Sequence, residues 1–387
     1  MGSQSAPATK AGMIALFGSG ETSASGQKIF DAILRQLPMS SRVVLLETPA
    51  GFELNSDKVI GRVGEFLYHR LQNYQPQVII VPARSRDSEY SPDNSQVVGP
   101  LYTADVIFMG PGSPTYAVRQ LKNSLAWDIL LASHRLGATI ALASAAAIAI
   151  SAYALPVYEI YKVGEDLHWK PGLDLFGQYG LSLVFIPHFN NNEGGEELDT
   201  SRCFMGKSRF ARLVELLPPD QTMIGIDEKT GLLINPQTGE CQVIGVGGVT
   251  LIHTDQTHKV PSSEEELKKI GLTDVAQHHQ GHVHQFQKGQ SFSLARIGAF
   301  RTPVGGNGLP LDVWQKALTE RKALTMKPEP PPEVLALIAE RQAARKQKDW
   351  QAADVIRRHI FELGWQVKDT ADGSQLEPIS GDSTSTG

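Results

Sequence analysis

The stretch ATIALASAAAIA, residues 138–149, changes character in its middle. Its first half has the short apolar pattern of a buried strand, and its second half is the Ala-rich start of a helix. Ser144 stands at the junction. A serine at a strand-to-helix corner is lifted out of a sheet, and the next backbone N–H faces the same space. This stretch predicts an α/β fold and makes Ser144 a candidate nucleophile, whereas the simpler interpretation is a serine packed within a helix.

Short β-branched runs repeat this pattern along the chain, with amphipathic helical stretches between them. They are Met13–Phe17, Val43–Leu46, Val78–Val81, Val106–Met109 and Leu183–Ile186. Strands that are apolar throughout are typical of a parallel sheet covered on both faces. We therefore expect an α/β domain over residues 11–255, with a mostly parallel sheet flanked by helices. Four later runs between residues 223 and 253 predict a small antiparallel extension.

Length and charge limit the classes of protein that remain. A chain of 387 residues predicts two or three domains, and 36 Lys+Arg against 41 Asp+Glu give a net charge of −5. That charge argues against a nucleic-acid footprint over the whole surface. Cys203 and Cys241 are too few for a disulfide framework. With neither a signal-peptide core nor an apolar run of membrane-spanning length, we expect a cytoplasmic protein without membrane contact.

The C-terminal third has a different composition. Residues 256–326 are polar, His-rich and Gly/Pro-rich, and predict an irregular connector. Residues 327–332 form a Pro-rich linker, because each proline fixes φ and removes a donor. Residues 333–377 predict a helical hairpin whose second helix begins after Asp349 and ends at Gly364. The tail 378–387 has the composition of a disordered segment.

Two patterns suggest bound groups only weakly. His278, His279, His282 and His284 have spacings that a metal site uses, but solvated loop histidines explain them better, and we expect no metal. Residues 18–21, Gly-Ser-Gly-Glu, lack the third glycine of a dinucleotide motif, so we expect no cofactor.

The carboxyl ends of the strands of an open parallel sheet are where ligands bind. Ser144 lies at one such end, and His188 follows Leu183–Ile186 at another. A histidine there is a candidate general base for the serine.

Residues 13–252 resemble the cyanophycinase and dipeptidase E family of serine peptidases, whose fold is that of class I glutamine amidotransferases, a flavodoxin-like architecture. The resemblance rests on motifs at residues 16–21, 107–112, 144–147, 187–189 and 225–230. It implies a serine-type hydrolase of a peptide or isopeptide amide bond, of the aspartyl dipeptidase or cyanophycinase kind, and allows a homodimer.

The resemblance also implies roles for individual residues. Ser144 matches the family's nucleophile, His188 its base, and Glu159 the acid about fifteen positions after the nucleophile that orients the histidine. A solvated Glu159 is an equal alternative. The oxyanion donors would be the backbone amides of Gly112 and Ala145.

Two positions of the motif around the serine depart from the family. Leu142 and Ala146 stand where the family has glycine, and a β-carbon at either place crowds the turn. The alternative function is therefore a catalytically impaired, amidotransferase-like protein that binds a peptide or RNA. A true amidotransferase would need cysteine at position 144, so ammonia transfer is not expected.

Substrate-binding candidates lie on two later segments. Lys207, Arg209 and Arg212 resemble the basic stretch that follows the family's histidine, although a solvated helix face explains any one of them better. Glu165 and Asp166 lie in a polar and aromatic loop, where either carboxylate would bind a basic side chain, and a purely structural loop around Trp169 is an equal alternative.

The C-terminal hairpin resembles the C-terminal segment of cysteinyl-tRNA synthetase over about forty residues. The synthetase's catalytic motifs are missing, so aminoacylation is not implied. RNA contact would come from basic residues that otherwise form a solvated face, namely Arg341, Arg345, Lys346, Lys348, Arg357 and Arg358.

Overall fold

The computed structural model describes residues 10–254, 282–325, 330–370 and 373–378. The chain divides into two compact units, residues 1–321 and residues 322–387. Each unit has its own apolar core and is described by itself below.

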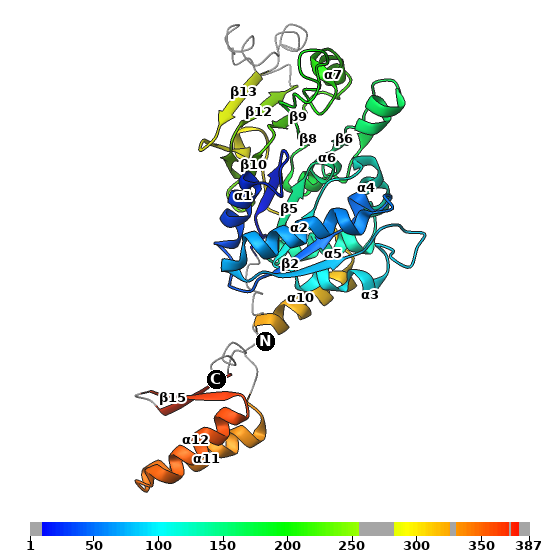
Figure 1. The fold of residues 1–387 in the computed structure, drawn as a ribbon. Helices are drawn as coiled ribbons and strands as arrows, with labels where there is room; N and C mark the ends of the chain where they lie inside the picture. The colour runs from blue at the N-terminus through cyan, green and yellow to red at the C-terminus, as the bar shows by residue number, and fades with distance from the viewer. Residues whose placement is uncertain (1–9, 255–281, 326–329, 371–372, 379–387) are drawn as a thin grey trace. The chain divides into compact units, whose positions relative to one another are not determined.

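The larger unit is built on an eight-stranded sheet, in the order β14-β11-β10-β1-β5-β4-β2-β3 (Figure 1). Its parallel strands are β1 (Ile14–Phe17), β2 (Arg42–Leu46), β3 (Gln77–Val81), β4 (Val106–Met109) and β5 (Thr139–Ala143). Antiparallel strands β10 (Thr230–Asn235), β11 (Glu240–Gly245) and β14 (Ser291–Ser293) extend it beyond β1. The mostly parallel α/β fold is thus confirmed, with β5 near the centre of the sheet.

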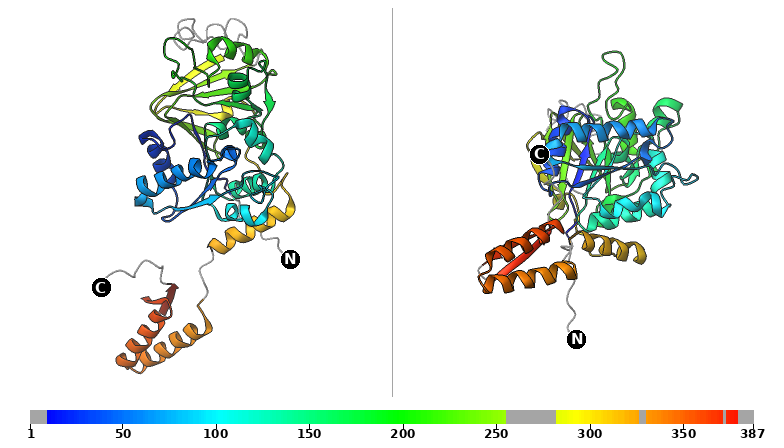
Figure 2. Two further views of the ribbon diagram at one scale, coloured as in Figure 1. Left: turned by 45° about the vertical axis from the view of Figure 1, so that its right-hand side comes forward. Right: turned by 60° about the horizontal axis from the view of Figure 1, so that its bottom comes forward.

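Helices cover both faces of this sheet (Figure 2). Helices α1 (Ala24–Leu34) and α2 (Ser56–Arg70) bury one face around an aromatic cluster that includes Phe17, Phe30 and Phe108. The other face packs on α3 (Ser95–Val98), α4 (Pro114–Leu121), α5 (Leu125–Arg135) and α6 (Ala145–Ala149). Burial on both sides explains why β1, β2, β4 and β5 read as unbroken apolar runs, whereas the edge strand β3 is partly exposed.

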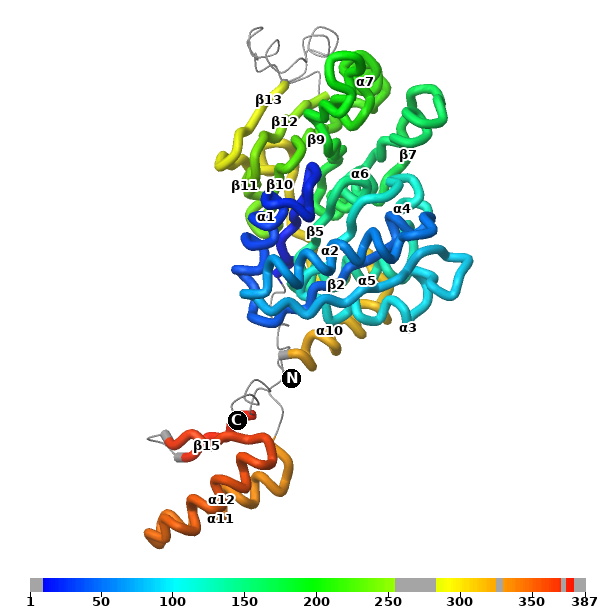
Figure 3. Tube along the Cα trace, viewed as in Figure 1, coloured from blue at the N-terminus to red at the C-terminus, as the bar shows by residue number. Residues whose placement is uncertain are grey.

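A second sheet of four strands was not predicted. Strands β8 (Leu183–Ile186), β9 (Thr222–Ile226), β12 (Gly248–His253) and β13 (His282–Gln287) lie side by side, and α7 (Gly206–Glu215) packs against them (Figure 3). The run Leu183–Ile186 was expected in the main parallel sheet. Its side chains alternate between the core beneath α7 and the main core, so its apolar pattern does not reveal which sheet it joins.

The segment after residue 281 is more regular than its composition predicts. The expected irregular connector contains β13, β14 and helix α10 (Leu311–Thr325). Val313 and Ala317 of α10 are buried in the main core. A two-stranded pair, β6 (Tyr153–Ala154) and β7 (Lys170–Pro171), frames the loop after α6.

The smaller unit contains helices α11 (Pro332–Lys346) and α12 (Trp350–Glu362). The Asp349 side chain accepts a hydrogen bond from the Ala352 amide at 3.0 Å, and Gly364 has φ +83°, so the predicted helix start and stop are confirmed. A hairpin of β15 (Trp365–Thr370) and β16 (Gly373–Pro378) was not predicted. Residues 327–329 of the predicted Pro-rich linker and the tail from residue 379 lie outside the described residues.

Candidate active site

Ser144 occupies a strained corner between β5 and α6. Its φ of 52° and ψ of −115° lie in a region that residues with a side chain rarely adopt. The flanking residues 141–143 and 145–147 are almost completely buried, which holds the corner in place. Leu142 and Ala146, the two departures from the family motif, both pack into the main core, so their β-carbons are accommodated.

His188 follows β8 and faces this serine. The Ser144 Oγ lies 2.9 Å from the His188 Nε2, and the His188 Nδ1 lies 3.1 Å from the Glu228 Oε1. An ionised carboxylate only accepts hydrogen bonds, so Nδ1 carries the ring proton and Nε2 accepts a hydrogen bond from the Ser144 hydroxyl. The three side chains form a continuous hydrogen-bonded chain.

Glu228, which completes this chain, follows β9. Its Oε1 also accepts a hydrogen bond from the Asn191 Nδ2 at 2.9 Å, and its backbone N–H donates to the Asn190 Oδ1 at 2.7 Å. The hydrogen bond from His188, more than any other contact, holds the pKa of Glu228 below its usual value. The carboxylate is therefore fixed in its ionised form beside the imidazole.

Glu159 was expected at the position that Glu228 takes. It begins a short π-helical turn, Glu159–Val163, and its Oε1 accepts hydrogen bonds from the Thr115 Oγ1 at 2.5 Å and the Lys170 Nζ at 3.5 Å. The structure places the Glu159 carboxylate at Thr115 and Lys170 and the Glu228 carboxylate at the imidazole. Glu228 belongs to the motif at residues 225–230, and its signal was a pair of carboxylates, Asp227 and Glu228, that follows an apolar strand.

A cavity of about 310 Å³ opens onto the serine and histidine. Gly112 and Ala145 line it, together with Tyr161, Cys203 and Phe204 among others. Gly112 has φ +144°, and a β-carbon there would lie 2.0 Å from the Pro49 carbonyl oxygen. The loop after β4 therefore requires glycine at this position in order to lie against the loop after β2.

A larger cavity of about 850 Å³ adjoins the first, and Tyr158 lines both. Glu159 is part of its wall, with Thr115, Tyr116, Arg119, Lys122 and Lys170. Aromatic faces and charges of both signs thus line the cavity that shares Tyr158 with the cavity at the serine.

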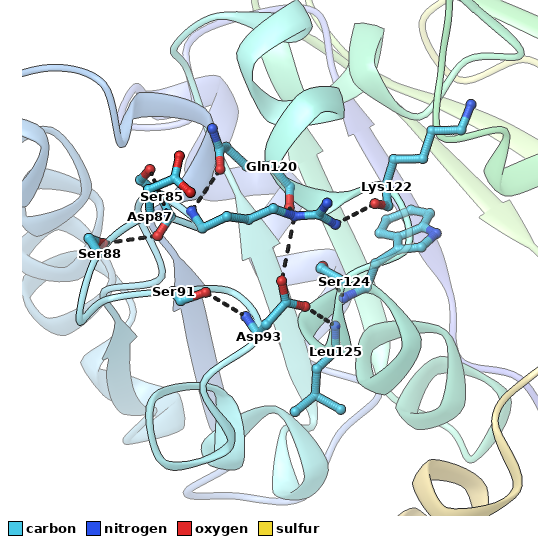
Figure 4. Close-up of polar contacts among 11 residues, drawn as sticks. Ser85, Asp87, Ser88, Ser91, Asp93, Gln120, Lys122, Ser124 and Leu125 are labelled. Carbon is cyan, nitrogen blue, oxygen red and sulfur yellow. Dashed lines mark hydrogen bonds and ion pairs between the residues drawn. The ribbon is translucent and has the colours of Figure 1, made fainter.

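The loop between β3 and α3 fixes the part of this wall that comes from the end of α4. The Arg86 backbone N–H donates to the Gln120 Oε1 at 2.8 Å, and its guanidinium donates to the Gln120 and Lys122 carbonyl oxygens. Figure 4 shows the Lys122 side chain extending away from this network, and Asp93 joining it to the start of α5 at Leu125. The backbone that carries Arg119 and Lys122 is thereby anchored.

The three predicted substrate-binding residues lie elsewhere. Glu165 is exposed and pairs with His168 at 3.7 Å, and Asp166 is exposed in the same loop. The Arg209 guanidinium donates to the carbonyl oxygens of Met205 and Phe204, so it caps the turn before α7. Other residues form the walls of both cavities.

Neither cysteine is paired, and both are buried. Burial raises the pKa of the Cys203 thiol to about 12, so it stays protonated although it borders the cavity. Among the described residues, no group of three or more His, Cys, Asp or Glu side chains is arranged to hold a metal. His278 and His279 lie outside that part of the chain. None of the described helices has both the length and the apolar character needed to cross a bilayer.

The two units are similar to different known proteins. The family model described as "Cysteinyl-tRNA ligase anticodon binding domain" matches residues 327–376. Cysteine–tRNA ligase of Methanosarcina mazei is 47% identical over 49 residues, 13% of this chain and 10% of the ligase. That of Opitutus terrae is 46% identical over 84 residues, 22% of this chain and 16% of the ligase. The chain thus spans only a small part of these relatives.

The larger unit is similar in fold to a peptidase from an acI-B1 actinobacterium. That crystal structure aligns with a TM-score of 0.54 and 20% identity, covering 74% of this chain and 98% of the peptidase. The similarity establishes the fold.

Proposed function

We propose that the larger unit is a serine-type hydrolase of a peptide or isopeptide amide bond. The observation that carries this proposal is the hydrogen-bonded chain from Ser144 through His188 to Glu228, with the serine on a positive-φ corner. The similarity in fold to a peptidase supports it.

In the acylation step, the Ser144 Oγ attacks the carbonyl carbon of the scissile amide while its proton passes to the His188 Nε2. The C=O π electrons move to the oxygen, and the backbone amides of Gly112 and Ala145 stabilise the resulting oxyanion. Glu228 stabilises the imidazolium. The C–N bond then breaks, and the amine leaves with the proton from Nε2.

In the deacylation step, water attacks the acyl-enzyme and gives a proton to the His188 Nε2. The second tetrahedral intermediate collapses, the C–Oγ bond breaks, and the serine oxygen recovers a proton from Nε2. The product is a carboxylic acid, and the resting state is restored.

The test is covalent labelling with a fluorophosphonate, which reacts with an activated serine. Wild-type protein should be labelled, and Ser144→Ala and His188→Ala should both lose the label. A folded wild type that resists labelling would favour the alternative, a binding protein that retains the fold without the chemistry.

We propose as a second function that the smaller unit binds RNA. The match to an anticodon-binding family supports this. Trp350 is 57% exposed, and the Arg345 guanidinium lies 5.6 Å from the centre of its ring. An exposed aromatic face beside a cation is suited to stack an unpaired base near a phosphate.

RNA binding is tested by titrating the full chain with total tRNA at several salt concentrations. The affinity should fall steeply with salt, because phosphate contacts release counterions. Replacing Arg345, Lys346 and Lys348 together by glutamine should reduce the slope by about 2 to 3. An unchanged slope would remove these residues from any RNA interface.

A further inference from the structure

Three consecutive residues behind the histidine have a left-handed backbone. Arg202, Cys203 and Phe204 have φ of 57°, 56° and 68°, and none of them is glycine. His188 is itself left-handed, with φ of 52°. Such conformations are unfavourable for residues with a β-carbon and persist only where surrounding contacts enforce them.

The left-handed turn 202–204 binds the backbone that carries His188. The Cys203 N–H donates to the His188 carbonyl oxygen at 3.1 Å, and the Arg202 N–H donates to the Phe189 carbonyl oxygen at 2.9 Å. The Arg202 Nη1 donates to that same Phe189 oxygen, also at 2.9 Å. The turn 202–204 thus holds the carbonyl oxygens of both His188 and Phe189 by hydrogen bonds.

The Arg202 side chain makes a second contact with this segment. It is buried, with 6% of the residue exposed, and its guanidinium carbon lies 4.1 Å from the centre of the Phe189 ring. The same ring packs closely over β9, where a β-carbon on Gly225 would lie 2.4 Å from a ring atom. Phe189 is therefore confined by both the guanidinium and the strand that leads to Glu228.

Charge also links Arg202 to the loop of the acid. The carboxylates of Asp199 and Asp227 attract its guanidinium, and Asp227 directly precedes Glu228. One buried arginine thus contacts the segment that carries His188 and is attracted to the segment that carries Glu228.

We propose that Arg202 is a positioning residue that holds His188 between Ser144 and Glu228. This inference rests on the proposed hydrolase function. Arg202 is not among the residues that line the cavity at Ser144. It acts by fixing the strained His188–Phe189 backbone, so that the imidazole spans the serine and the carboxylate before substrate arrives.

The experiment compares the full-length wild type with Arg202→Met, Arg202→Lys and the control Arg135→Met. Arg135 is also 6% exposed, and its Nη1 donates to the carbonyl oxygens of Gly305 and Asn307 within the larger unit. The control therefore removes a buried arginine of the same kind that does not contact the segment 188–189. The measured quantities are the fluorophosphonate labelling rate, the Tm, and the downfield proton NMR signal of the His188 Nδ1–H, assigned by its loss in Glu228→Gln.

We expect Arg202→Met to label about 10 to 100 times more slowly than wild type and to lose the downfield signal, because the Nη1 hydrogen bond to the Phe189 carbonyl and the guanidinium contact with the Phe189 ring are removed. Arg202→Lys retains the charge without the planar fork, and its labelling rate should fall between those of Arg202→Met and wild type. Arg135→Met should keep both the rate and the signal even if its Tm falls.

Labelling of either folded Arg202 variant at the wild-type rate, with the signal retained, would overturn the proposal and leave Arg202 a purely structural residue. If Arg202→Met does not fold, Arg202→Lys decides by the same two measurements. A folded wild type that is not labelled would instead contradict the hydrolase proposal itself, so the two failures are distinguishable.

Discussion

At the scale of single residues, the sharpest question is which carboxylate orients His188. Glu228 contacts the imidazole, whereas Glu159 pairs with Thr115 and Lys170. Glu228→Gln should slow fluorophosphonate labelling by about 10² to 10⁴, because an amide neither fixes the ring tautomer nor stabilises the imidazolium. Glu159→Gln, the matched control, should label within about twofold of wild type. The reverse ranking of the two labelling rates would restore Glu159 as the orienting acid.

A buried histidine, His134, should make the stability of the larger unit depend on pH. His134 is completely buried, with its Nε2 at 2.5 Å from the Tyr179 hydroxyl, and burial lowers its pKa to about 4. In the unfolded chain His134 binds a proton near pH 6.5, whereas in the folded protein it stays neutral down to about pH 4. The contribution of neutral His134 to folding stability is therefore complete above pH 6.5 and is lost as the pH falls toward 4. The free energy of unfolding should decrease by up to about 3 kcal/mol across this window. Denaturant titrations at pH 7 and pH 4.5 measure this decrease in the free energy of unfolding. The decrease should be smaller in His134→Gln. An equal decrease in His134→Gln would show that other groups cause it.

At the scale of elements, the loop after β4 depends on one glycine. A β-carbon at Gly112 would collide with the Pro49 carbonyl, and its positive φ adds strain. Gly112→Ala should therefore displace the proposed oxyanion amide and slow labelling by about 10² to 10³. In Gly61→Ala, on α2, the new methyl group meets no atom within 4 Å. That control should keep its reactivity and gain about 0.5 to 1 kcal/mol of stability. Retained labelling in Gly112→Ala would exclude this amide from catalysis.

The same scale shows what the sequence could and could not predict. The parallel strands β1, β2, β4 and β5 were predictable because their unbroken apolar runs reflect burial on both faces. The corner at Ser144 was predictable because a strand pattern meets a helix pattern there. The partition of β8 and β9 into a second sheet was not, since long-range pairing leaves no mark on a four-residue apolar run. The role of Glu228 beside His188 depends on that partition, because the two residues follow adjacent parallel strands of the second sheet.

At the scale of the whole molecule, the two units have separate physical bases. The smaller unit has its own core of Val334, Ile360, Trp365 and Val367. It also buries Arg341 against Asp369, joining α11 to β15 through hydrogen bonds of 2.9 Å. The guanidinium holds the pKa of that carboxylate well below its usual range. All of these contacts lie within the smaller unit. The sheets and the proposed catalytic chain of the larger unit likewise consist of that unit's own residues. We therefore expect each unit to fold without the other.

A chain that ends after Thr325 tests this independence. It keeps α10, whose Val313 and Ala317 are buried in the main core, and it keeps every residue proposed to act in hydrolysis. We expect it to fold with the Tm of the larger unit and to react with a fluorophosphonate within about twofold of the full chain, because every element that positions Ser144, His188 and Glu228 belongs to the larger unit. RNA binding, if measured for the full chain, should disappear. A truncated protein that folds but has lost serine reactivity would show that the smaller unit takes part in the chemistry. Hydrolysis could then no longer be assigned to the larger unit by itself.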